Sequence, residues 1–227
     1  MKTLVVVAHP RLKNSSTESF LKKAATCESN VTWHPLALPF NIEKEQKLLN
    51  TADRIIFQFP MYWYSAPAIL KEWLDKVWNS RLISRRLVAG RELGIVVTVG
   101  HAASSFQPGA SQQYTIAELL RPFEALAHHL GLKYLPAFPI YQFDQQSDEE
   151  RQLLFIRYQQ YLTIPKLGHF KSNVKWFADK LEHKIIKEKD IVQRAKLEQL
   201  LTLLNDQQEE LDDLFASITW LREKEDD

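Results

Sequence analysis

"VVVAHPRLKNSSTES", residues 5–19, decides the fold because an unbroken apolar run gives way to a segment rich in hydroxyl groups. A run of this kind, rich in β-branched residues, is typical of a strand that is buried on both faces. Ser15, Ser16 and Thr17 stand where a helix would begin, and their side chains are of the type that caps a first turn. The stretch therefore predicts a strand, a loop and a helix, which is the opening unit of an α/β fold.

Short apolar runs and longer stretches of helical period continue to alternate through residue 161. We expect strands over residues 3–8, 30–36, 53–60, 91–100 and 133–142, and helices over 16–25, 42–51, 67–78, 115–130 and 147–161. Because crossover connections between parallel strands are right-handed, five such strands predict a doubly wound parallel sheet of order 2-1-3-4-5.

The character of the sequence changes after Tyr161, which predicts a domain over residues 1–162 and a helical extension over 163–227. The extension carries a seven-residue apolar pattern, in which one position holds Leu197, Leu204, Leu211 and Ile218 and the other holds Leu200, Gln207, Leu214 and Leu221. Three interpretations stay open. The extension is a hairpin packed on its own domain, a helix exchanged with or zipped onto a second subunit, or a free helix.

Composition and charge exclude several classes of protein. The formal net charge of +1 gives no reason to expect nucleic acid as a partner. The single cysteine, Cys27, rules out an internal disulfide, and neither a signal peptide nor an apolar run long enough to span a bilayer is present. We therefore expect a cytoplasmic protein. Because His128 and His129 diverge on a helix and Cys27 stands alone, we expect no metal site.

Ligands of a doubly wound sheet bind beyond the carboxyl ends of the strands, where the strand order reverses. The loops "AHPRLKNSST" and "QFPMYWYSAP" meet there with "VTVGHAASSF". The hydroxyl groups at the start of the first helix, together with its N–H groups, favour an anion such as a phosphate, although the same residues also serve as simple helix caps. All six glycines lie far from this loop, which argues against a dinucleotide fingerprint or a Walker loop.

Aromatic residues follow the central strand in "FPMYWYSAP". Large rings beside a phosphate site suit a flat aromatic cofactor, although such rings also occur in cores and interfaces. Together "AHP" with a serine six residues after the histidine, "QFPMYWYSAPAILKEWLDKVW" and "ELLRPFEALAHHLGL" resemble the flavodoxin-like NAD(P)H:quinone oxidoreductases, a family that includes DT-diaphorase-type reductases and ancillary oxidoreductases of potassium efflux systems. The resemblance runs from Met1 to about Tyr161 and implies a flavodoxin-like fold.

The resemblance also implies a tightly bound flavin, FMN or FAD, with NAD(P)H as co-substrate. It places flavin contacts at His9, Ser15, Ser16, Thr17, Pro60, Met61, Tyr62, Trp63, Tyr64, Thr98, Val99, Gly100 and Phe106. His101 and Tyr64 are the candidate catalytic residues, with His101 stabilising the reduced flavin or donating to the acceptor. Arg81, Arg85, Arg86 and Arg91 are a basic cluster that suits the extra phosphate of NADPH or, equally, a solvated helix end.

Hydride would pass from NAD(P)H through the flavin to a quinone-like acceptor in a ping-pong cycle. Family members are generally homodimers, so we expect a homodimer. Glu18 stands where many members have an asparagine near the phosphate, and its carboxylate would repel that phosphate unless it turned outward. This departure favours an alternative, a regulatory or binding subunit of a transporter or other partner with weak or no flavin. A flavin reductase or azoreductase is a further alternative.

Overall fold

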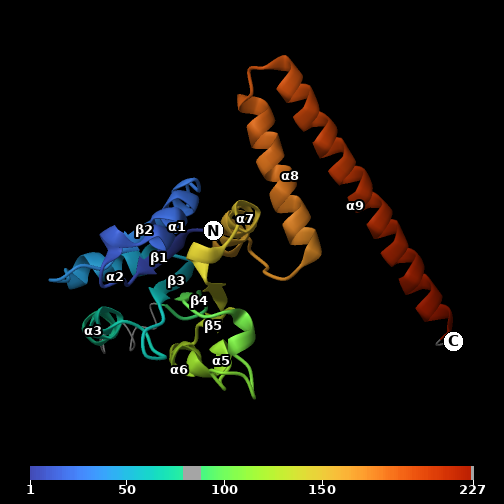
Figure 1. Ribbon diagram of the computed structural model, residues 1–227. Helices are drawn as coiled ribbons and strands as arrows, with labels where there is room; N and C mark the ends of the chain where they lie inside the picture. The colour runs from blue at the N-terminus through green and yellow to red at the C-terminus, as the bar shows by residue number, and fades with distance from the viewer. Residues whose placement is uncertain (79–87, 226–227) are drawn as a thin grey trace. The chain divides into compact units, whose positions relative to one another are not determined.

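The computed structural model describes residues 1–78 and 88–225 and divides the chain into two compact units, Met1–Thr163 and Ile164–Asp227 (Figure 1). The strands are β1 (Thr3–Val7), β2 (Val31–Pro35), β3 (Arg54–Pro60), β4 (Glu92–Val99), β5 (Lys133–Tyr134) and β6 (Phe138–Tyr141). The helices are α1 (Ser16–Thr26), α2 (Ile42–Thr51), α3 (Ala68–Val77), α5 (Ile116–Leu119), α6 (Arg121–Leu130), α7 (Asp148–Thr163), α8 (Phe170–Lys187) and α9 (Ile191–Glu225).

The sheet of the first unit is parallel and has the order β2-β1-β3-β4-β5, with β6 also paired to β4. This confirms the predicted topology. Every residue of β1 and β3 is buried, as expected for central strands with helices on both faces. The order reverses between β1 and β3, so the loops that follow these two strands flank the switch point.

Alternate side chains of the central strands serve two different helical layers. Leu4, Phe57 and Ile95 belong to one core cluster with Leu70 and Trp73 of α3. The residues between them point to the other face, where α1 and α7 pack together. Gln58 of β3 lies on this second face, which brings its side chain against both α1 and α7.

Two expected elements are each divided in the structure. The strand expected over residues 133–142 is two short strands, β5 and β6, because Pro136 interrupts the ladder between them. The helix expected over 115–130 is divided into α5 and α6 at Leu120, where Pro122 occupies the first turn of the second helix.

The second unit is a hairpin in which α8 packs antiparallel against α9, and α9 is the longer helix and extends beyond α8 (Figure 1). Lys171, at the start of α8, forms a 2.7 Å salt bridge with Asp212 in the second half of α9. The helical extension predicted from the sequence therefore has the form of two helices packed on each other. None of the helices in residues 1–78 and 88–225 has the length and apolarity needed to cross a membrane.

Candidate functional site

A cleft of about 260 Å³ opens at the carboxyl ends of the central strands, beside the switch point. The loops after β1, β3, β4 and β6 all contribute to it. Its lining residues are His9, Ser15, Thr17, Pro60, Met61, Tyr62, Thr98, Val99, Gly100, Ile140, Gln142, Phe143, Asp144 and Gln145.

One end of the cleft is the first turn of α1. Ser15 is the N-cap of this helix, and its Oγ accepts the backbone N–H of Glu18 at 3.1 Å. The N–H groups of Ser16 and Thr17 belong to the same turn, where no carbonyl of the helix can accept them. These donors and the positive end of the helix dipole make this end of the cleft suitable for an anion.

His9 adds a further donor at this end. The backbone N–H of Arg11 donates to His9 Nδ1 at 3.0 Å, so a neutral His9 carries its proton on Nε2. Burial lowers the pKa of His9, and the neighbouring Arg11 lowers it further. His9 is therefore held as a neutral imidazole whose Nε2–H is available to a ligand.

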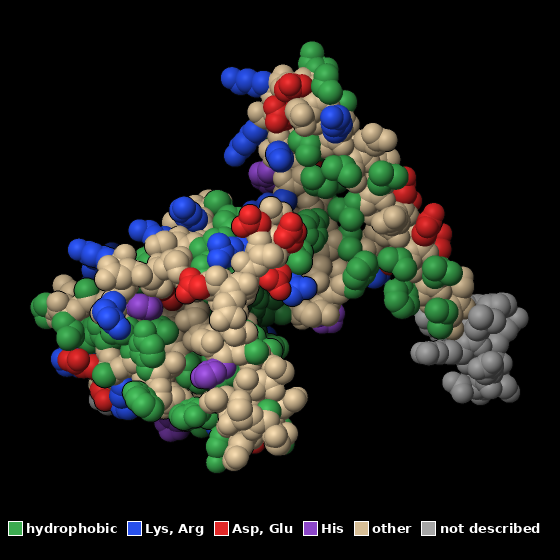
Figure 2. Space-filling view, viewed as in Figure 1, with side chains coloured by type: hydrophobic (Ala, Val, Ile, Leu, Met, Phe, Trp, Pro, Cys, Tyr) green, Lys and Arg blue, Asp and Glu red, His purple; other side chains and the backbone are tan. Residues whose placement is uncertain are grey.

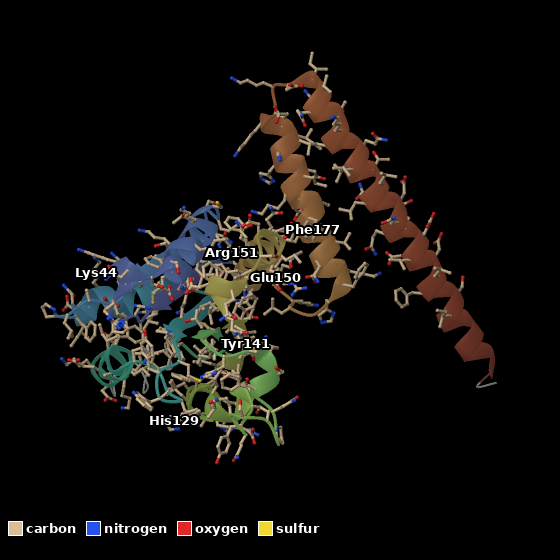
Figure 3. The ribbon with its side chains drawn as sticks, viewed as in Figure 1. Lys44, His129, Tyr141, Glu150, Arg151 and Phe177 are labelled. Atoms are coloured by element: carbon tan, nitrogen blue, oxygen red, sulfur yellow. The ribbon has the colours of Figure 1, made fainter. Side chains whose placement is uncertain are left out.

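Asp144 places a carboxylate at the same end of the cleft. Ser16 Oγ donates to Asp144 Oδ1 at 2.7 Å, and Ser16 itself is not among the lining residues. The guanidinium of Arg151 lies 5.0 Å from the centroid of the neighbouring Phe143 ring, and Figure 3 labels this arginine on α7. This end of the cleft thus contains one acidic group, whose charge would oppose a bound anion.

Glu18 is buried in the core, with 1% of its surface exposed. Its Oε2 accepts Gln58 Nε2 at 2.5 Å, and Gln58 Oε1 in turn accepts the hydroxyl of Tyr158 at 2.5 Å. Burial raises the pKa of Glu18 to about 7, although the Gln58 hydrogen bond opposes the rise. Glu18 does not turn outward: its side chain points inward between α1, β3 and α7.

The loop after β3 makes a tight turn with its aromatic residues at the tip. The backbone groups of Tyr62 and Ser65 exchange two hydrogen bonds of 3.0 Å. Trp63 and Tyr64 between them have φ of 49° and 61°, the left-handed region that a type I′ turn requires and that glycine or asparagine usually fills. Trp63 is 95% exposed as a result, and the Tyr64 hydroxyl donates to Gln112 Oε1 at 3.1 Å.

The loop after β4 forms the wall opposite α1. Met61 N–H donates to Thr98 O at 2.9 Å, which ties the loops after β3 and β4 together. Val99 O accepts the N–H of Gln142 at 2.8 Å, which brings the loop after β6 into the cleft. Phe106 lies behind this wall, with its ring centroid 6.4 Å from that of His101 and 6.1 Å from that of Tyr141, which Figure 3 labels.

The structure brings nine of the sequence-predicted residues into the cleft lining and leaves five outside it. Those in the lining are His9, Ser15, Thr17, Pro60, Met61, Tyr62, Thr98, Val99 and Gly100. Those outside it are Ser16, Trp63, Tyr64, His101 and Phe106. Sequence reasoning missed Ile140 in β6 and residues 142–145 after it, although their position at the carboxyl end of a strand beside β4 was the signal that could have found them.

Arg91 is the described member of the predicted basic cluster, and it lies away from the cleft. Arg91 precedes β4 at the amino end of the sheet, and its guanidinium donates to the carbonyls of Leu49 and Asn50. The interpretation of Arg91 as a ligand of the NADPH phosphate is therefore wrong, because the cleft lies at the opposite ends of the strands. The other three arginines, at 81, 85 and 86, lie outside the described residues.

Two curated relatives are similar to most of this chain. An uncharacterized NAD(P)H oxidoreductase, YdeQ, of Bacillus subtilis is 38% identical over 177 residues, which are 74% of this chain and 89% of the relative. The glutathione-regulated potassium-efflux system ancillary protein KefG of Escherichia coli is 37% identical over 157 residues, which are 66% of this chain and 85% of that protein.

Two solved structures are similar to the chain in fold and sequence. An NADPH-quinone reductase from P. pentosaceus is 48% identical with a TM-score of 0.71, and the match covers 72% of this chain and 98% of that one. General stress protein 14 from Treponema denticola, solved in complex with FMN, is 28% identical with a TM-score of 0.64 and matches 72% of this chain and 100% of its own. The family model described as "Flavodoxin-like fold" matches residues 1–162, and the chain therefore belongs to the flavodoxin-like family.

Proposed function

We propose that this chain is an NAD(P)H oxidoreductase that reduces a quinone or similar acceptor with the help of a bound flavin, FMN rather than FAD. The observation that carries the proposal is the cleft at the switch point, where an anion-binding helix end meets the loops after β3 and β4. The similarity to an NADPH-quinone reductase supports the reaction, and the FMN complex of a second similar structure supports the cofactor.

The described residues fit the parts of a flavin mononucleotide. Ser15, Thr17 and neutral His9 would hold the phosphate together with the first-turn N–H groups of α1. The cleft residues from Pro60 to Tyr62 and from Thr98 to Gly100 would hold the ring through backbone groups and apolar surface. The bound flavin would supply hydride transfer, and the chain's own task would be to orient it and exclude water.

The aromatic tip of the β3 loop is the proposed docking place for nicotinamide and acceptor. Trp63 and Tyr64 lie outside the cleft lining but stand on the same turn as Tyr62, which is part of it. Tyr64 and His101 are the proposed catalytic side chains, Tyr64 being fixed by Gln112 and His101 by its contact with Phe106. A single site that serves donor and acceptor in turn would give ping-pong kinetics.

The proposal is tested by flavin binding and by turnover. The purified protein is expected to bind FMN, seen as a visible flavin absorbance or as quenched FMN fluorescence, and to oxidise NADH or NADPH when a quinone is present. Thr17→Glu, which adds a carboxylate to the anion-binding end, is expected to weaken FMN affinity by more than about tenfold. Thr26→Glu, in the last turn of the same helix, is the matched control and should leave FMN affinity unchanged. A protein that binds no FMN and reduces no quinone with either nicotinamide would overturn the proposal.

The second candidate is an ancillary subunit of a transporter, which the similarity to KefG favours. The two candidates differ in the flavin measurement, because a purely regulatory subunit does not need turnover with a quinone. Azo compounds in the same assay test the azoreductase alternative.

We propose the cytoplasm as the compartment, since the lone Cys27 is a free, exposed thiol. We also propose a homodimer, because Tyr62, Trp63 and Tyr114 leave aromatic surface exposed beside the cleft.

A further inference from the structure

The packing of α8 on α9 uses only one of the two apolar positions of the heptad pattern. The half-buried α9 residues on the side of α8 are Leu197, Leu201, Leu204, Gln208 and Leu211, which recur three or four residues apart and include the first three members of the first heptad position. Beside it runs a second line of the helix, which holds Leu200 and Leu214 of the second heptad position together with Leu203 and Ile218, and α8 leaves these four side chains exposed.

That second line of α9 is apolar and exposed. Leu200 is 53%, Leu203 52%, Leu214 59% and Ile218 45% exposed. At about 100° per residue these four side chains fall within roughly 60° of one another around the helix axis, directly beside the line that contacts α8. Figure 2 shows hydrophobic side chains gathered along this helix on the side that faces the viewer.

The neighbouring helix extends this surface. Phe170 and Phe177 of α8 are 57% and 39% exposed, and their seven-residue spacing places them on one line of that helix, where Figure 3 labels Phe177. Each of the two lines is offset from the direction in which its helix faces the other helix. Because the helices are right-handed and antiparallel, these two offsets place the Phe170–Phe177 line and the Leu200–Ile218 line on the same side of the hairpin. The Lys171–Asp212 salt bridge joins the helices on the opposite side by the same geometry. The hairpin therefore has one exposed apolar face, which Gln207 interrupts on α9 between Leu203 and Leu214.

We propose that this hairpin face, formed by Phe170 and Phe177 of α8 and Leu200, Leu203, Leu214 and Ile218 of α9, packs against the same face of a second copy of the chain. The result is an antiparallel four-helix bundle at the dimer axis. The apolar face of α9 is broader than the seam between two helices of a coiled coil. One partner helix cannot cover such a face, so further helices are needed to bury it.

The charges on the hairpin favour a second copy over an unrelated partner. Exposed lysines, Lys184 and Lys187, lie on α8 beside this face, whereas exposed acids, Glu210 and Asp213, lie beside it in the second half of α9. A twofold rotation lays the acidic part of each α9 near the basic α8 of the other copy, and it does so twice. Each copy thus carries both the basic group and the acidic group that the contact needs. A different protein would have to present the same two charges at the same spacing.

This inference does not rest on the proposed function. The family match ends at residue 162, so the hairpin lies beyond the part of the chain that the family accounts for. The proposed contact is also separate from the aromatic surface beside the cleft. Loss of self-association through the hairpin and loss of flavin chemistry would therefore be observed independently.

The first test measures self-association of the full chain by sedimentation equilibrium. Leu214→Glu combined with Ile218→Glu places two carboxylates on the hairpin face and is expected to raise the dissociation constant by at least about tenfold. The matched control, Thr202→Glu combined with Ala216→Glu, adds the same charge to exposed positions on the far side of α9 and should change it less than about twofold. Far-UV circular dichroism establishes that both variants keep their helices. Equal dissociation constants for the two double variants would overturn the proposal.

The second test identifies what covers the face. A photoreactive p-benzoylphenylalanine replaces Leu203 in the full chain, and ¹⁵N-labelled and unlabelled protein are mixed before irradiation. Cross-linked peptides that join one labelled and one unlabelled segment, both from residues 164–225, are expected. Cross-links from Leu203 to residues 1–163, or cross-links only within one chain, would overturn the proposal.

Discussion

At the scale of single residues, Glu18 couples the stability of the first unit to pH. Its folded-state pKa of about 7 lies above the ordinary 4.5, so the native state binds this proton more tightly than the unfolded chain does. The stabilisation from the protonated carboxyl is therefore complete below about pH 4.5 and is lost as the pH rises through about 7. Relative to Glu18→Gln, the free energy of unfolding of the wild type should fall by up to about 3 kcal/mol between pH 5 and pH 8.

Urea unfolding at several pH values measures this difference. Glu43→Gln removes an exposed carboxyl from the start of α2 and serves as the control, whose stability curve should run parallel to that of the wild type. A Glu18→Gln curve that also runs parallel to the wild type across this range would show that Glu18 is ionised in the folded protein at every pH tested.

Asp144 sets the electrostatics of the anion-binding end, on the proposed function. Its carboxylate lines the cleft and accepts the Ser16 hydroxyl, so a flavin phosphate would meet a like charge there. Asp144→Asn should tighten FMN binding by about three- to tenfold at low ionic strength, an effect that added salt screens. Fluorescence titration with FMN measures the affinity, and Asp148→Asn, an exposed acid at the start of α7, is the control. Weaker binding by Asp144→Asn would show instead that the Ser16–Asp144 hydrogen bond shapes the phosphate site.

At the scale of structural elements, the turn after β3 exposes aromatic rings and lowers the stability of the fold, because two bulky residues adopt the left-handed conformation. Two non-glycine residues in the left-handed region cost of order 1–3 kcal/mol each, and bulky side chains are rarely found there. Trp63→Asn combined with Tyr64→Gly installs the residues that a type I′ turn prefers. Urea unfolding of the flavin-free protein should show a gain of about 1–2 kcal/mol, while quinone turnover should fall because the aromatic rings are gone. A loss of stability would mean that the Tyr64–Gln112 hydrogen bond outweighs the strain.

The helices and strands could be predicted from the sequence where their apolar pattern is continuous and clearly bounded. β1 and β3 are continuous apolar runs and were predicted within a residue of their ends, as was the start of α1 from its serine cap. The segment over 133–142 was harder, because its prolines read equally as an edge strand or as a break between two strands. That weakness also hid Gln142 to Gln145, since a loop is found only after the strand before it has been placed correctly. The inward direction of Glu18 depends on Gln58 and Tyr158, which are distant in sequence, and no local pattern reveals it.

At the scale of the whole molecule, the heptad pattern indicated a partner for the last helix without saying which one. Three outcomes fitted the sequence, and the structure shows α8 on one line of α9 with the other line exposed. Periodicity reports how much of a helix is apolar, but the number of helices that share this surface depends on packing that the repeat alone does not encode.

On the proposed function, a bound flavin would stabilise only part of the chain, because one of the two compact units carries the cleft. A ligand stabilises the unit that binds it, by about 2.7 kcal/mol when its concentration is 100 times the dissociation constant. Differential scanning calorimetry with FMN should therefore raise the unfolding temperature of the first unit and leave the transition of the α8–α9 hairpin in place. Riboflavin, which lacks the phosphate, should give a smaller rise because the first turn of α1 and His9 then have no anion to hold. Equal rises with FMN and riboflavin would place the binding energy in the ring contacts alone, whereas a joint shift of both transitions would mean that the two units unfold as one.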